Sequence, residues 1–294
     1  MKKGLVSIVI VNYQDPTDTI KCLESLQSLS YNQLEVILVD NGTQENRTHL
    51  FQSAYETCHV INRTENGGFA AGANAGIKAS KGEFVLLLNN DTIVTPDFIQ
   101  PLVDLLNSQK EIGIVSPQIR FLGQKEIIQY AGSTHIHPIL ARGKKIAFTK
   151  KVDSKYNATY KTGLCNGACM LIRRHVIEDI GLLPEQYFMY YEEHDFTARA
   201  KMMGWETYYV GESVIYHKSG IKEDKSSSMR TYYLIRNRLL FQRKFQSGLI
   251  LAISMTYLVL GVLPKLILKN LLNKDFTGIK STLKAYSWHL NIIK

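Results

Sequence analysis

The stretch "FVLLLNNDTIV", Phe84 to Val94, joins an apolar run directly to a polar cluster. Five apolar residues are followed by Asn89, Asn90 and Asp91, which supply two amides and a single carboxylate. A continuous apolar run is typical of a strand that is buried on both faces of a sheet. The polar cluster is therefore either a turn that ends the strand or a site at which the strand holds Asp91 in place.

Three further apolar runs resemble this one, namely "LVSIVIV" (5–11), "LEVILVD" (34–40) and "IGIVS" (112–116). The segments between the runs carry helix-start signals, because Asp15-Pro16 and Thr95-Pro96 each place a capping residue before a proline. This alternation predicts an α/β fold with a doubly wound, mostly parallel, Rossmann-like sheet. Ligands bind such sheets at the carboxyl ends of the strands, where we expect Asp40-Asn41 and Asn90-Asp91 to lie.

The charge is distributed unevenly along the 294 residues, whose total net charge is +9. Residues 1–221 carry 22 basic and 23 acidic side chains, whereas residues 222–294 carry 13 basic and 3 acidic ones. The excess positive charge therefore lies in the last quarter of the chain. This asymmetry indicates that the tail alone touches a polyanionic surface, either a membrane or a nucleic acid.

The four cysteines show no CxxC pairing, which favours reduced, structural residues in a cytosolic protein. The N-terminal "MKKGLVSIVIVNYQD" has the lysines and the apolar run of a signal peptide. However, its run spans only about seven residues, and no small-residue cleavage site follows it. We therefore expect a first strand here, and a protein that is not secreted.

Three glycines, Gly68, Gly72 and Gly76, recur every four residues in "NRTENGGFAAGANAGIKAS" and would share one helical face. Such a ridge allows close approach either of a sheet or of a ligand. The spacing matches neither the phosphate loop GxxxxGK[ST] nor the dinucleotide pattern GxGxxG. Asn66 and Asn74 add polar groups, which a pure packing face would avoid.

The stretch "YYEEHDFTARA" places Glu192, Glu193 and Asp195 within four positions, directly after several aromatic residues. Like charges this close raise one another's pKa, and partial burial raises it further. One of the carboxylates could thus serve as a general base. The alternative is an acidic cap at the start of a helix, favoured by the helix dipole.

In "VIYHKSG", His217 follows a short apolar strand. A lone histidine is more often structural than a ligand. With Asp91, however, it could hold a hard divalent cation whose other ligands are diphosphate oxygens. Between Arg120 and Gly163 the pattern blurs, and this part is a candidate for a loop over a site. A strand, a turn at Leu183-Pro184 and a helix around 193–203 are expected after it.

The tail begins with the basic, aromatic segment "MRTYYLIRNRLLFQRKF" and continues with "GLILAISMTYLVLGVLP", 17 residues without a charge. That length is at the lower edge for a membrane span. The remainder looks amphipathic and basic, with Tyr286 and Trp288 as candidate interface anchors. We expect attachment to one face of the membrane; a true span and a soluble packing helix are the alternatives.

Taken in order, "SIVIVNY", "VILVDNGT", "NGGFAAGANAG", "LLLNNDTIVTPDF", "GACMLIRR", "FMYYEEHDF", "YHKSG" and "YYLIRNRLL" resemble the motifs of glycosyltransferase family 2, in particular its bacterial rhamnosyltransferase-like members. The resemblance covers roughly residues 5–240. It implies a GT-A fold and inverting transfer of a sugar, rhamnose or another hexose, from a nucleoside-diphosphate donor. The acceptor would be a hydroxyl of a lipid-linked or growing cell-surface glycan, reached from the inner face of the cell membrane.

The resemblance also implies roles for single residues. Tyr13, Asp40 and Asn41 would lie against the nucleobase of a UDP- or dTDP-linked sugar, which present the same imide edge. Asp91, in place of the family's DxD motif, would hold Mn²⁺ or Mg²⁺ with help from His217. Further positions near the ribose, the diphosphate or the site would be Asn66, Gly68, Asn74, Asn90, Arg236 and Arg238.

The family's base is usually an aspartate of a Glu-Asp pair, and here the pair is Glu192-Glu193. We assign the base to Glu193, with Asp195 as the second candidate and Glu192 orienting the acceptor. The expected domains are a GT-A domain at 1–225, with a nucleotide-sugar half (1–118) and an acceptor half (119–225), and C-terminal helices at 226–294. One alternative is a catalytically inactive nucleotide- or glycan-binding module. A nucleic-acid-binding protein is not expected, because the positive charge lies in a tail with a long apolar run.

Overall fold

The computed structural model describes residues 1–218 and 228–291, and the chain divides into two compact units. The first unit comprises residues 1–134, 145–188 and 192–221, and the second comprises residues 135–144, 189–191 and 222–294. The predicted division into a catalytic domain at 1–225 and a tail at 226–294 concerns function and stays a prediction.

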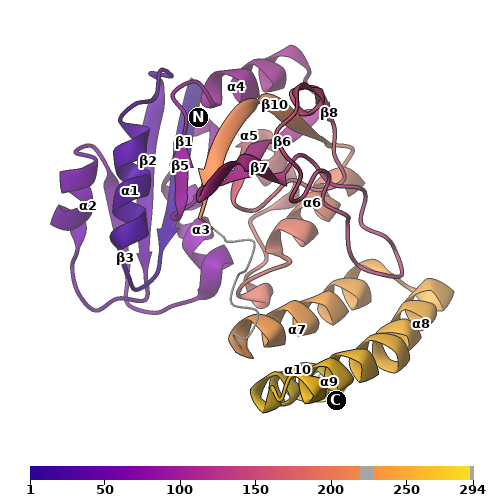
Figure 1. The fold of residues 1–294 in the computed structure, drawn as a ribbon. Coiled ribbons are helices and arrows are strands. Elements are labelled where there is room, and N and C mark those ends of the chain that lie inside the picture. The colour runs from indigo at the N-terminus through magenta and orange to yellow at the C-terminus, as the bar shows by residue number, and fades with distance from the viewer. Residues whose placement is uncertain (219–227, 292–294) are drawn as a thin grey trace. The chain divides into compact units, whose positions relative to one another are not determined.

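The first unit is built on a mixed sheet of ten strands among the described residues (Figure 1). Eight of them lie in the order β3-β2-β1-β4-β9-β6-β10-β5, while β7 pairs with β6 and β8 with β10. The strands are β1 (Lys2–Asn12), β2 (Leu34–Asn41), β3 (His59–Arg63), β4 (Gly82–Asn89), β5 (Thr92–Val94), β6 (Ile112–Phe121), β7 (Gln124–Tyr130), β8 (Thr159–Lys161), β9 (Cys169–Arg173) and β10 (Glu206–His217).

The predicted α/β fold is confirmed, and the predicted parallel order holds for the strands β3, β2, β1 and β4. Beyond β4 the sheet becomes mixed, because β9 runs antiparallel to both β4 and β6. The strand β10 returns parallel to β6 and pairs antiparallel with the short strand β5. This last pairing places His217 opposite Thr92, next to the "NND" cluster.

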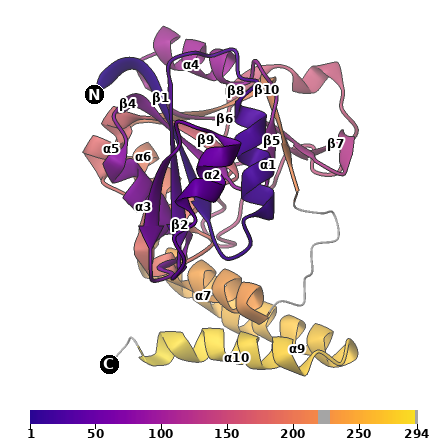
Figure 2. The ribbon, with the colours of Figure 1, turned by 90° about the vertical axis from the view of Figure 1, so that its left-hand side faces the viewer.

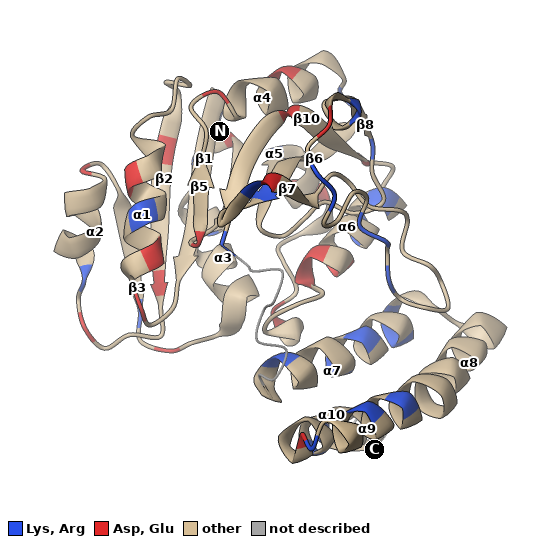
Figure 3. Ribbon diagram, viewed as in Figure 1, with Lys and Arg blue, Asp and Glu red and all other residues tan. Residues whose placement is uncertain are grey.

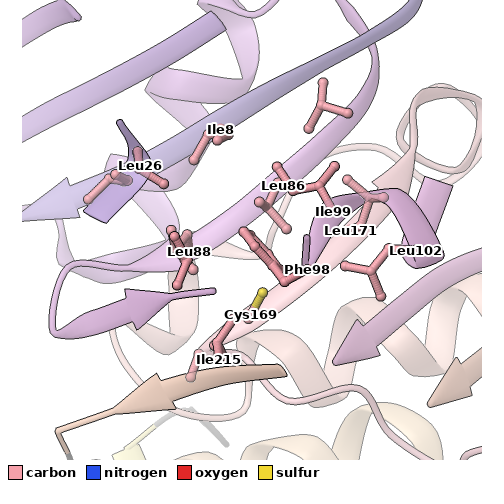
Figure 4. Close-up of a cluster of buried hydrophobic side chains, with 14 of the residues drawn as sticks. Ile8, Leu26, Leu86, Leu88, Phe98, Ile99, Leu102, Cys169, Leu171 and Ile215 are labelled. Carbon is pink, nitrogen blue, oxygen red and sulfur yellow. The ribbon is translucent and has the colours of Figure 1, made fainter. Parts of the chain in front are cut away.

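Helices cover both faces of the sheet, as expected for a doubly wound fold. One apolar core packs the side chains of β1, β4 and β9 against α1 and α4, as Figure 4 shows for Ile8, Leu86 and Phe98. The second core lies on the other face against α3, α5 and α6 and includes Val9, Ile77 and Phe196. The helices of this unit are α1 (Thr17–Leu26), α2 (Thr48–Ala54), α3 (Gly68–Ala79), α4 (Ile99–Ser108), α5 (Arg174–Ile180) and α6 (Glu192–Met202).

The glycine ridge of α3 serves mainly to pack this helix against β1. A Cβ atom added at Gly72 would overlap the side chain of Val11, and one at Gly76 would overlap Val9. The packing interpretation of the ridge is therefore confirmed for these two glycines. Gly68, at the start of the helix, meets a different neighbour, which is described with the candidate site.

Two smaller expectations are also confirmed. The apolar N-terminal run forms the central strand β1, paired with β2 and β4. All four cysteines are buried and none forms a disulfide.

The second unit consists of helices and two short connecting pieces. Its helical elements are α7 (Ser228–Phe245), α8 (Gly248–Thr256), the π-helical segment η3 (Tyr257–Val262), α9 (Leu263–Leu272) and α10 (Phe276–Asn291). Figure 2 shows α10 returning alongside α7, and the Nε2 atom of His289 lies 2.8 Å from the carbonyl oxygen of Arg236. Burial lowers the pKa of His289 to about 4, so this histidine is neutral at physiological pH.

The helix α10 has an unusual arrangement of small and large side chains. Its buried positions are the small or polar residues Gly278, Thr282, Ala285 and His289. Phe276, Leu283 and Leu290, spaced seven residues apart, are instead 71%, 48% and 68% exposed. Small residues at helix contacts and large apolar residues outside are typical of helices in contact with lipid, whereas a soluble helix buries its large residues.

One helical stretch in the described part of the chain, Gly248–Leu272, is long and apolar enough to cross a membrane by length and composition. Only 11% of its most apolar part is buried. Ser254 and Leu258 are its buried residues, and Leu249 and Leu260 are among its most exposed.

Candidate active site

The carboxyl ends of the parallel strands place several predicted side chains at one edge of the sheet. In the strand register, Asn12 lies opposite Asp40, and Asn41 lies opposite Arg63. The strand β4 brings Asn89 to the same edge, opposite Val11. The "NND" cluster is therefore both a strand end and part of a concentration of polar groups.

Asp40 is fully buried and ionically paired with Arg47. The Nη2 and Nε atoms of Arg47 donate to the two Asp40 carboxylate oxygens over 2.6 and 2.9 Å. Asn12 donates a third hydrogen bond of 2.8 Å to Asp40. Tyr13, next in the chain, is 47% exposed and so presents its ring at the surface. Arg47 was missed from the sequence, because nothing near it in the chain marks its partner.

A chain of buried hydrogen bonds links Asp40 to the end of β4. The Nδ2 atom of Asn90 donates to the Thr19 hydroxyl over 2.9 Å, and this hydroxyl donates to Asn12 Oδ1 over 2.6 Å. Asn12 in turn donates to Asp40. The hydroxyl of Thr19, on α1, thus fixes the side chain that precedes Asp91 relative to the ends of β1 and β2.

Thr19→Val keeps the shape of the side chain but removes this hydroxyl. We expect a loss of about 1–3 kcal/mol in the free energy of unfolding, because the change removes the hydrogen-bond partner of the buried Oδ1 atom of Asn12 and of the half-buried Nδ2 atom of Asn90. Urea denaturation measures the loss. Thr159→Val, at an exposed position of β8, is the matched control and should have no comparable effect. Equal midpoints for the Thr19 variant and the control would contradict the role of this hydroxyl.

Asn41, Asn66 and Gly68 form a second polar group where β2 meets α3. The Nδ2 atom of Asn41 donates to Asn66 Oδ1 over 3.0 Å and to the carbonyl of Gly68 over 3.1 Å. The backbone N–H of Gly68 donates to Asn66 Oδ1 over 2.9 Å. The Oδ1 atom of Asn41 is buried and accepts no hydrogen bond from the described residues.

Gly68 brings the segment before α6 against the start of α3. Its φ angle is +84°, and an added Cβ would overlap the carbonyl group of Phe188. The same carbonyl accepts a 2.7 Å hydrogen bond from the N–H of Phe69. Phe188 itself has a φ of +65°. Only glycine at position 68 allows this approach, which links the nucleotide-side helix to the residues preceding Glu192.

Asn74 lies further along α3 and fastens the same segment at a second point. Its Nδ2 atom donates to the Leu183 carbonyl over 2.9 Å and to Glu185 Oε1 over 2.8 Å. Its Oδ1 atom accepts from the N–H of Leu183 over 3.0 Å. Both amide hydrogens are thereby used, and we propose a structural role for Asn74 instead of the predicted contact with the diphosphate.

Asp91 and His217 face one another across the β5–β10 pairing. The Nε2 atom of His217 lies 3.0 Å from Asp91 Oδ1. The other ring nitrogen, Nδ1, lies 2.7 Å from Gln129 Oε1. Because that oxygen only accepts, the Nδ1 atom carries a hydrogen, and Nε2 is the ring nitrogen that faces Asp91. The Nδ2 amide of Asn89 makes only a long contact of 3.5 Å with this nitrogen.

Glu192 and Glu193 open α6 as a buried pair of carboxyl groups. Burial, reinforced by the charge of Glu193, raises the pKa of Glu192 well above its usual range. Burial alone would also raise the pKa of Glu193, but His194, whose Nδ1 lies 3.2 Å from Glu193 Oε1, lowers it below its ordinary value. The two opposite shifts favour a proton on Glu192 and the negative charge on Glu193. Among the described residues, the buried Oε2 atom of each glutamate has no hydrogen-bond partner.

Asp195, one position beyond His194, has a different environment. It is fully buried and accepts hydrogen bonds of 3.0 Å from the Tyr187 hydroxyl and 2.8 Å from Arg199 Nε. Arg199 also donates to the carbonyls of Ile180 and Leu182. These contacts tie the first turn of α6 to the preceding loop, so we propose a structural role for Asp195. The spacing of four residues to Arg199 is the sequence signal that could have revealed it.

A short connection joins the Asp91 region to the glutamate pair. The carbonyl of Ala168 accepts a 2.9 Å hydrogen bond from the N–H of Asn89. At the preceding residue, Gly167, an added Cβ atom would lie 3.6–3.7 Å from the Glu193 side chain, which is ordinary van der Waals contact. The first unit thus brings Asp91, His217 and Glu193 to one region, although they come from three separate parts of the chain.

Arg236 belongs to the second unit. Its guanidinium lies 4.8 Å from the ring centres of both Tyr233 and Trp288, and its Nε atom donates to Asn237 over 2.8 Å. Arg238, its neighbour in the sequence, donates to the carbonyl of Leu140, also in the second unit. In the described residues, both arginines are thus engaged within the helical unit, and their predicted role near the donor stays a prediction.

The chain is similar to known glycosyltransferases along most of its length. The chain is 28% identical over 282 residues to the low-salt glycan biosynthesis hexosyltransferase Agl10 of Haloferax volcanii, covering 93% of this chain and 87% of the relative. It is 25% identical over 240 residues to the N-acetylglucosaminyl-diphospho-decaprenol L-rhamnosyltransferase of Mycobacterium tuberculosis, covering 73% and 76% of the two chains.

Among solved structures, the mannosyltransferase of Pyrobaculum calidifontis in complex with GDP-Man and Mn²⁺ matches with a TM-score of 0.61 at 15% identity, over 97% of this chain and 75% of that one. GalNAc-T7 with UDP, GalNAc and Mn²⁺ matches with a TM-score of 0.64 at 17% identity, over 79% and 47%. These likenesses show the GT-A fold. The model of glycosyl transferase family 2 matches residues 7–181, which is more than half of the chain. The protein is a glycosyltransferase and belongs to glycosyl transferase family 2.

Proposed function

We propose that the protein is an inverting, metal-dependent hexosyltransferase. It would move rhamnose or another hexose from a UDP- or dTDP-linked donor to a hydroxyl of a lipid-linked or growing cell-surface glycan. The observation that supports this proposal best is the Asp91–His217 pair at the end of β4, together with the link from Asn89 through Ala168 and Gly167 toward Glu193. A cation-binding pair and a candidate base within one region are what transfer from a diphosphate donor requires.

The donor nucleotide would bind at the ends of β1 and β2. The exposed ring of Tyr13 offers a stacking surface for the base. Asp40, held by Arg47 and Asn12, can accept a hydrogen bond from the imide N–H that uracil and thymine share. The unpartnered Oδ1 atom of Asn41 offers a second acceptor. Asn66 and Asn90 border this region and are proposed to lie near the ribose and the diphosphate.

The residues present fit a divalent cation at Asp91 and His217. With Nδ1 directed to Gln129, the Nε2 atom of His217 faces a carboxylate oxygen of Asp91 at 3.0 Å. Two such electron-rich atoms lie this close only when a proton or a cation is shared between them. Among the described residues no group of three metal-ligating side chains exists, so the donor diphosphate would complete the shell. The chemistry supplied by Mn²⁺ or Mg²⁺ there is neutralisation of the charge that develops on the leaving diphosphate.

The base is proposed to be Glu193. Its carboxylate would take the proton of the acceptor hydroxyl, whose oxygen then forms a bond to the anomeric carbon. The bond from that carbon to the phosphate oxygen breaks on the opposite side, and its electron pair leaves with the diphosphate. Attack opposite the leaving group inverts the anomeric configuration. Glu192, which holds the pair's proton, can donate a hydrogen bond that orients the acceptor.

A screen of nucleotide sugars tests the reaction. The purified protein is incubated with UDP- and dTDP-linked hexoses, Mn²⁺ or Mg²⁺, and a lipid-linked acceptor, and the product linkage is determined by NMR. We expect transfer with inversion and loss of activity with EDTA. Retention of configuration would contradict the mechanism. Tight nucleotide binding without transfer to any acceptor would favour the alternative of an inactive binding module.

The helical tail is proposed to attach the enzyme peripherally to the inner, cytoplasmic face of the membrane. The apolar stretch Gly248–Leu272 is little buried, and α10 presents Phe276, Leu283 and Leu290 at its surface. Lysines lie close by in the sequence, and Figure 3 shows basic residues on α7 and on the helices that follow it. An exposed apolar face combined with positive charge matches an anionic lipid surface. Attachment there would bring the active site to a lipid-linked acceptor.

Replacing Phe276, Leu283 and Leu290 together with serine should weaken binding to anionic vesicles more than tenfold. Full burial of one such side chain contributes about 1.5–3 kcal/mol. Even partial insertion of three of them therefore contributes strongly to the free energy of vesicle binding. Sedimentation with phosphatidylglycerol vesicles measures the binding. Lys280→Gln with Lys284→Gln, which removes charge but no apolar area from α10, should have a smaller effect that salt abolishes. Unchanged sedimentation of the serine variant would contradict insertion of this face.

A further inference from the structure

A basic ribbon, Lys145–Lys151 with the sequence "KIAFTKK", lies beside β7 and contains three lysines and no acid. All three lysines are exposed. Figure 3 shows Lys and Arg residues along this loop between β7 and β8. The ribbon stands out because residues 1–221 are almost charge-balanced, with 22 basic and 23 acidic side chains.

The backbone of the basic ribbon is held firmly in place. The N–H of Thr149 donates to the carbonyl of Ile128 over 2.9 Å, and the N–H of Ile128 donates to the carbonyl of Lys150 over 2.8 Å. Lys145 pairs with Ser133 and Lys151 with Ile127 in isolated β-bridges. The lysines therefore project from a fixed strip on β7.

The fixed strip places positive charge near the glutamate pair. The Nζ atom of Lys145 lies 5.3 Å from the ring centre of Phe148, whose ring in turn packs against Phe121. The charge of Lys145 also helps to lower the pKa of Glu193, although the direct partner of that carboxylate is His194. The contacts of the strip agree with this nearness, because Ser133, the bridge partner of Lys145, accepts a 2.7 Å hydrogen bond from the N–H of Gly163. The carbonyl of Gly163 in turn accepts one of 2.7 Å from Lys201 on α6, the helix that opens with the glutamate pair.

We propose that the basic ribbon binds the diphosphate of an acceptor in which that group joins the sugar to a lipid. This inference rests on the proposed function and adds the chemical class of its acceptor. When a hydroxyl of the acceptor sugar lies at Glu193, the anomeric oxygen lies at another edge of the same ring. A diphosphate attached there projects away from the base by about one sugar ring. Lys145 supplies positive charge in that neighbourhood, and Lys150 and Lys151 extend it along the strip.

The shared chemistry is an anionic phosphate, and it could come from three sources: the acceptor, the donor or a membrane headgroup. The donor diphosphate has its own proposed partners in the Asp91–His217 pair. A headgroup would bind the ribbon regardless of which acceptor is present. The acceptor is therefore distinguished by a loss of affinity confined to acceptors that carry the diphosphate.

The test combines Lys145→Gln, Lys150→Gln and Lys151→Gln and compares two acceptors in detergent. One is N-acetylglucosamine joined to farnesyl through a diphosphate, and the other is the neutral farnesyl glycoside of the same sugar. We expect KM for the diphosphate acceptor to rise at least tenfold, and KM for the neutral acceptor and for the nucleotide sugar to stay within twofold. Lys110→Gln, which removes an exposed charge just before the start of β6, is the matched control and should change none of these values.

Equal changes for both acceptors, or no change for either, would overturn the proposal. A rise confined to KM for the nucleotide sugar would assign the ribbon to the donor instead. Loss of binding to phosphatidylglycerol vesicles with both acceptor KM values unchanged would assign it to lipid headgroups. Calorimetric binding of the diphosphate acceptor, expected to weaken at least tenfold in the triple variant, keeps the test valid even if no transfer occurs. Absence of transfer by the unmodified enzyme with every acceptor would instead count against the proposed function.

Discussion

Glu193→Gln is expected to lower the rate of sugar transfer by on the order of 10²–10⁴, the usual contribution of a general base. Glutamine has nearly the shape of glutamate but cannot accept the proton of the acceptor hydroxyl at neutral pH. The nucleotide would bind at the ends of β1 and β2, so its dissociation constant should change by no more than a few-fold. Single-turnover transfer and isothermal titration with UDP or dTDP measure the two quantities.

Glu192→Gln is the matched control, because it makes the same change one residue earlier in the same buried pair. Burial and the charge of Glu193 raise the pKa of Glu192, which favours its protonated form, and glutamine imitates that form. We expect a loss of less than tenfold. A larger loss in the Glu192 variant than in the Glu193 variant would exchange the two roles, and full activity in both would place the base elsewhere.

The pH dependence of the reaction follows from the same pair. The base acts when ionised, so the rate is present above the pKa of Glu193 and lost as the pH falls through it. Because His194 lowers that pKa, the acidic limb of the profile should lie below the range of an ordinary glutamate. The pH profile of the residual activity of Glu193→Gln should lack this acidic limb. An acidic limb above that range would contradict ionisation of Glu193 in the free enzyme.

The parts of the fold that could be predicted from the sequence are those in which local pattern and tertiary burial agree. The runs that became β1, β2 and β4 are apolar throughout because both faces of these strands are covered. In contrast, β5 and β8 are three residues long and owe their existence to pairing with β10. No period can be read from three residues, so the change from a parallel to a mixed sheet was not visible in the sequence.

The candidate site likewise contains residues that the sequence marks and residues that only the folded chain reveals. The ends of apolar strands marked Asp40 and Asp91, because a buried strand that stops at an acid is a strong local signal. His217 was named as the companion of Asp91 from the sequence, whereas Arg47 and Gln129 come from other elements and depend on the folded topology. The sequence also did not separate side chains with a structural role from side chains of the same type that are available to a substrate.

Asn74 and Asp195 illustrate this difficulty, since an amide in the glycine ridge and an acid in the acidic cluster both matched the expected chemistry. In the structure their hydrogen bonds tie down the segment between β9 and α6, through Leu183 and Tyr187. Their residue types fit either role. Only the identity of the contacting atoms separates a structural amide or carboxylate from one that is available to a substrate.

Asp91→Ala should lower the transfer rate at least about 10²-fold and abolish its dependence on Mn²⁺ or Mg²⁺. It removes one of the two side chains proposed to hold the cation, and a metal in this role contributes several kcal/mol of charge stabilisation in the transition state. His217 alone would remain, and a single imidazole is a poor site for a hard cation. The measurement is the transfer rate as a function of metal concentration, with and without EDTA.

Gln129→Leu is a milder change to compare with Asp91→Ala, because Gln129 contacts the Nδ1 atom of His217 and not the nitrogen that faces Asp91. Without an acceptor for Nδ1–H, neither the tautomer nor the orientation of the His217 ring is fixed. Loss of such a supporting hydrogen bond weakens metal binding by about 10–100-fold. Activity should therefore return at high metal concentration in Gln129→Leu but not in Asp91→Ala. If Asp91→Ala kept the metal half-saturation and EDTA sensitivity of the unmodified enzyme, the cation would lie elsewhere. The end of β4 would then be only a turn.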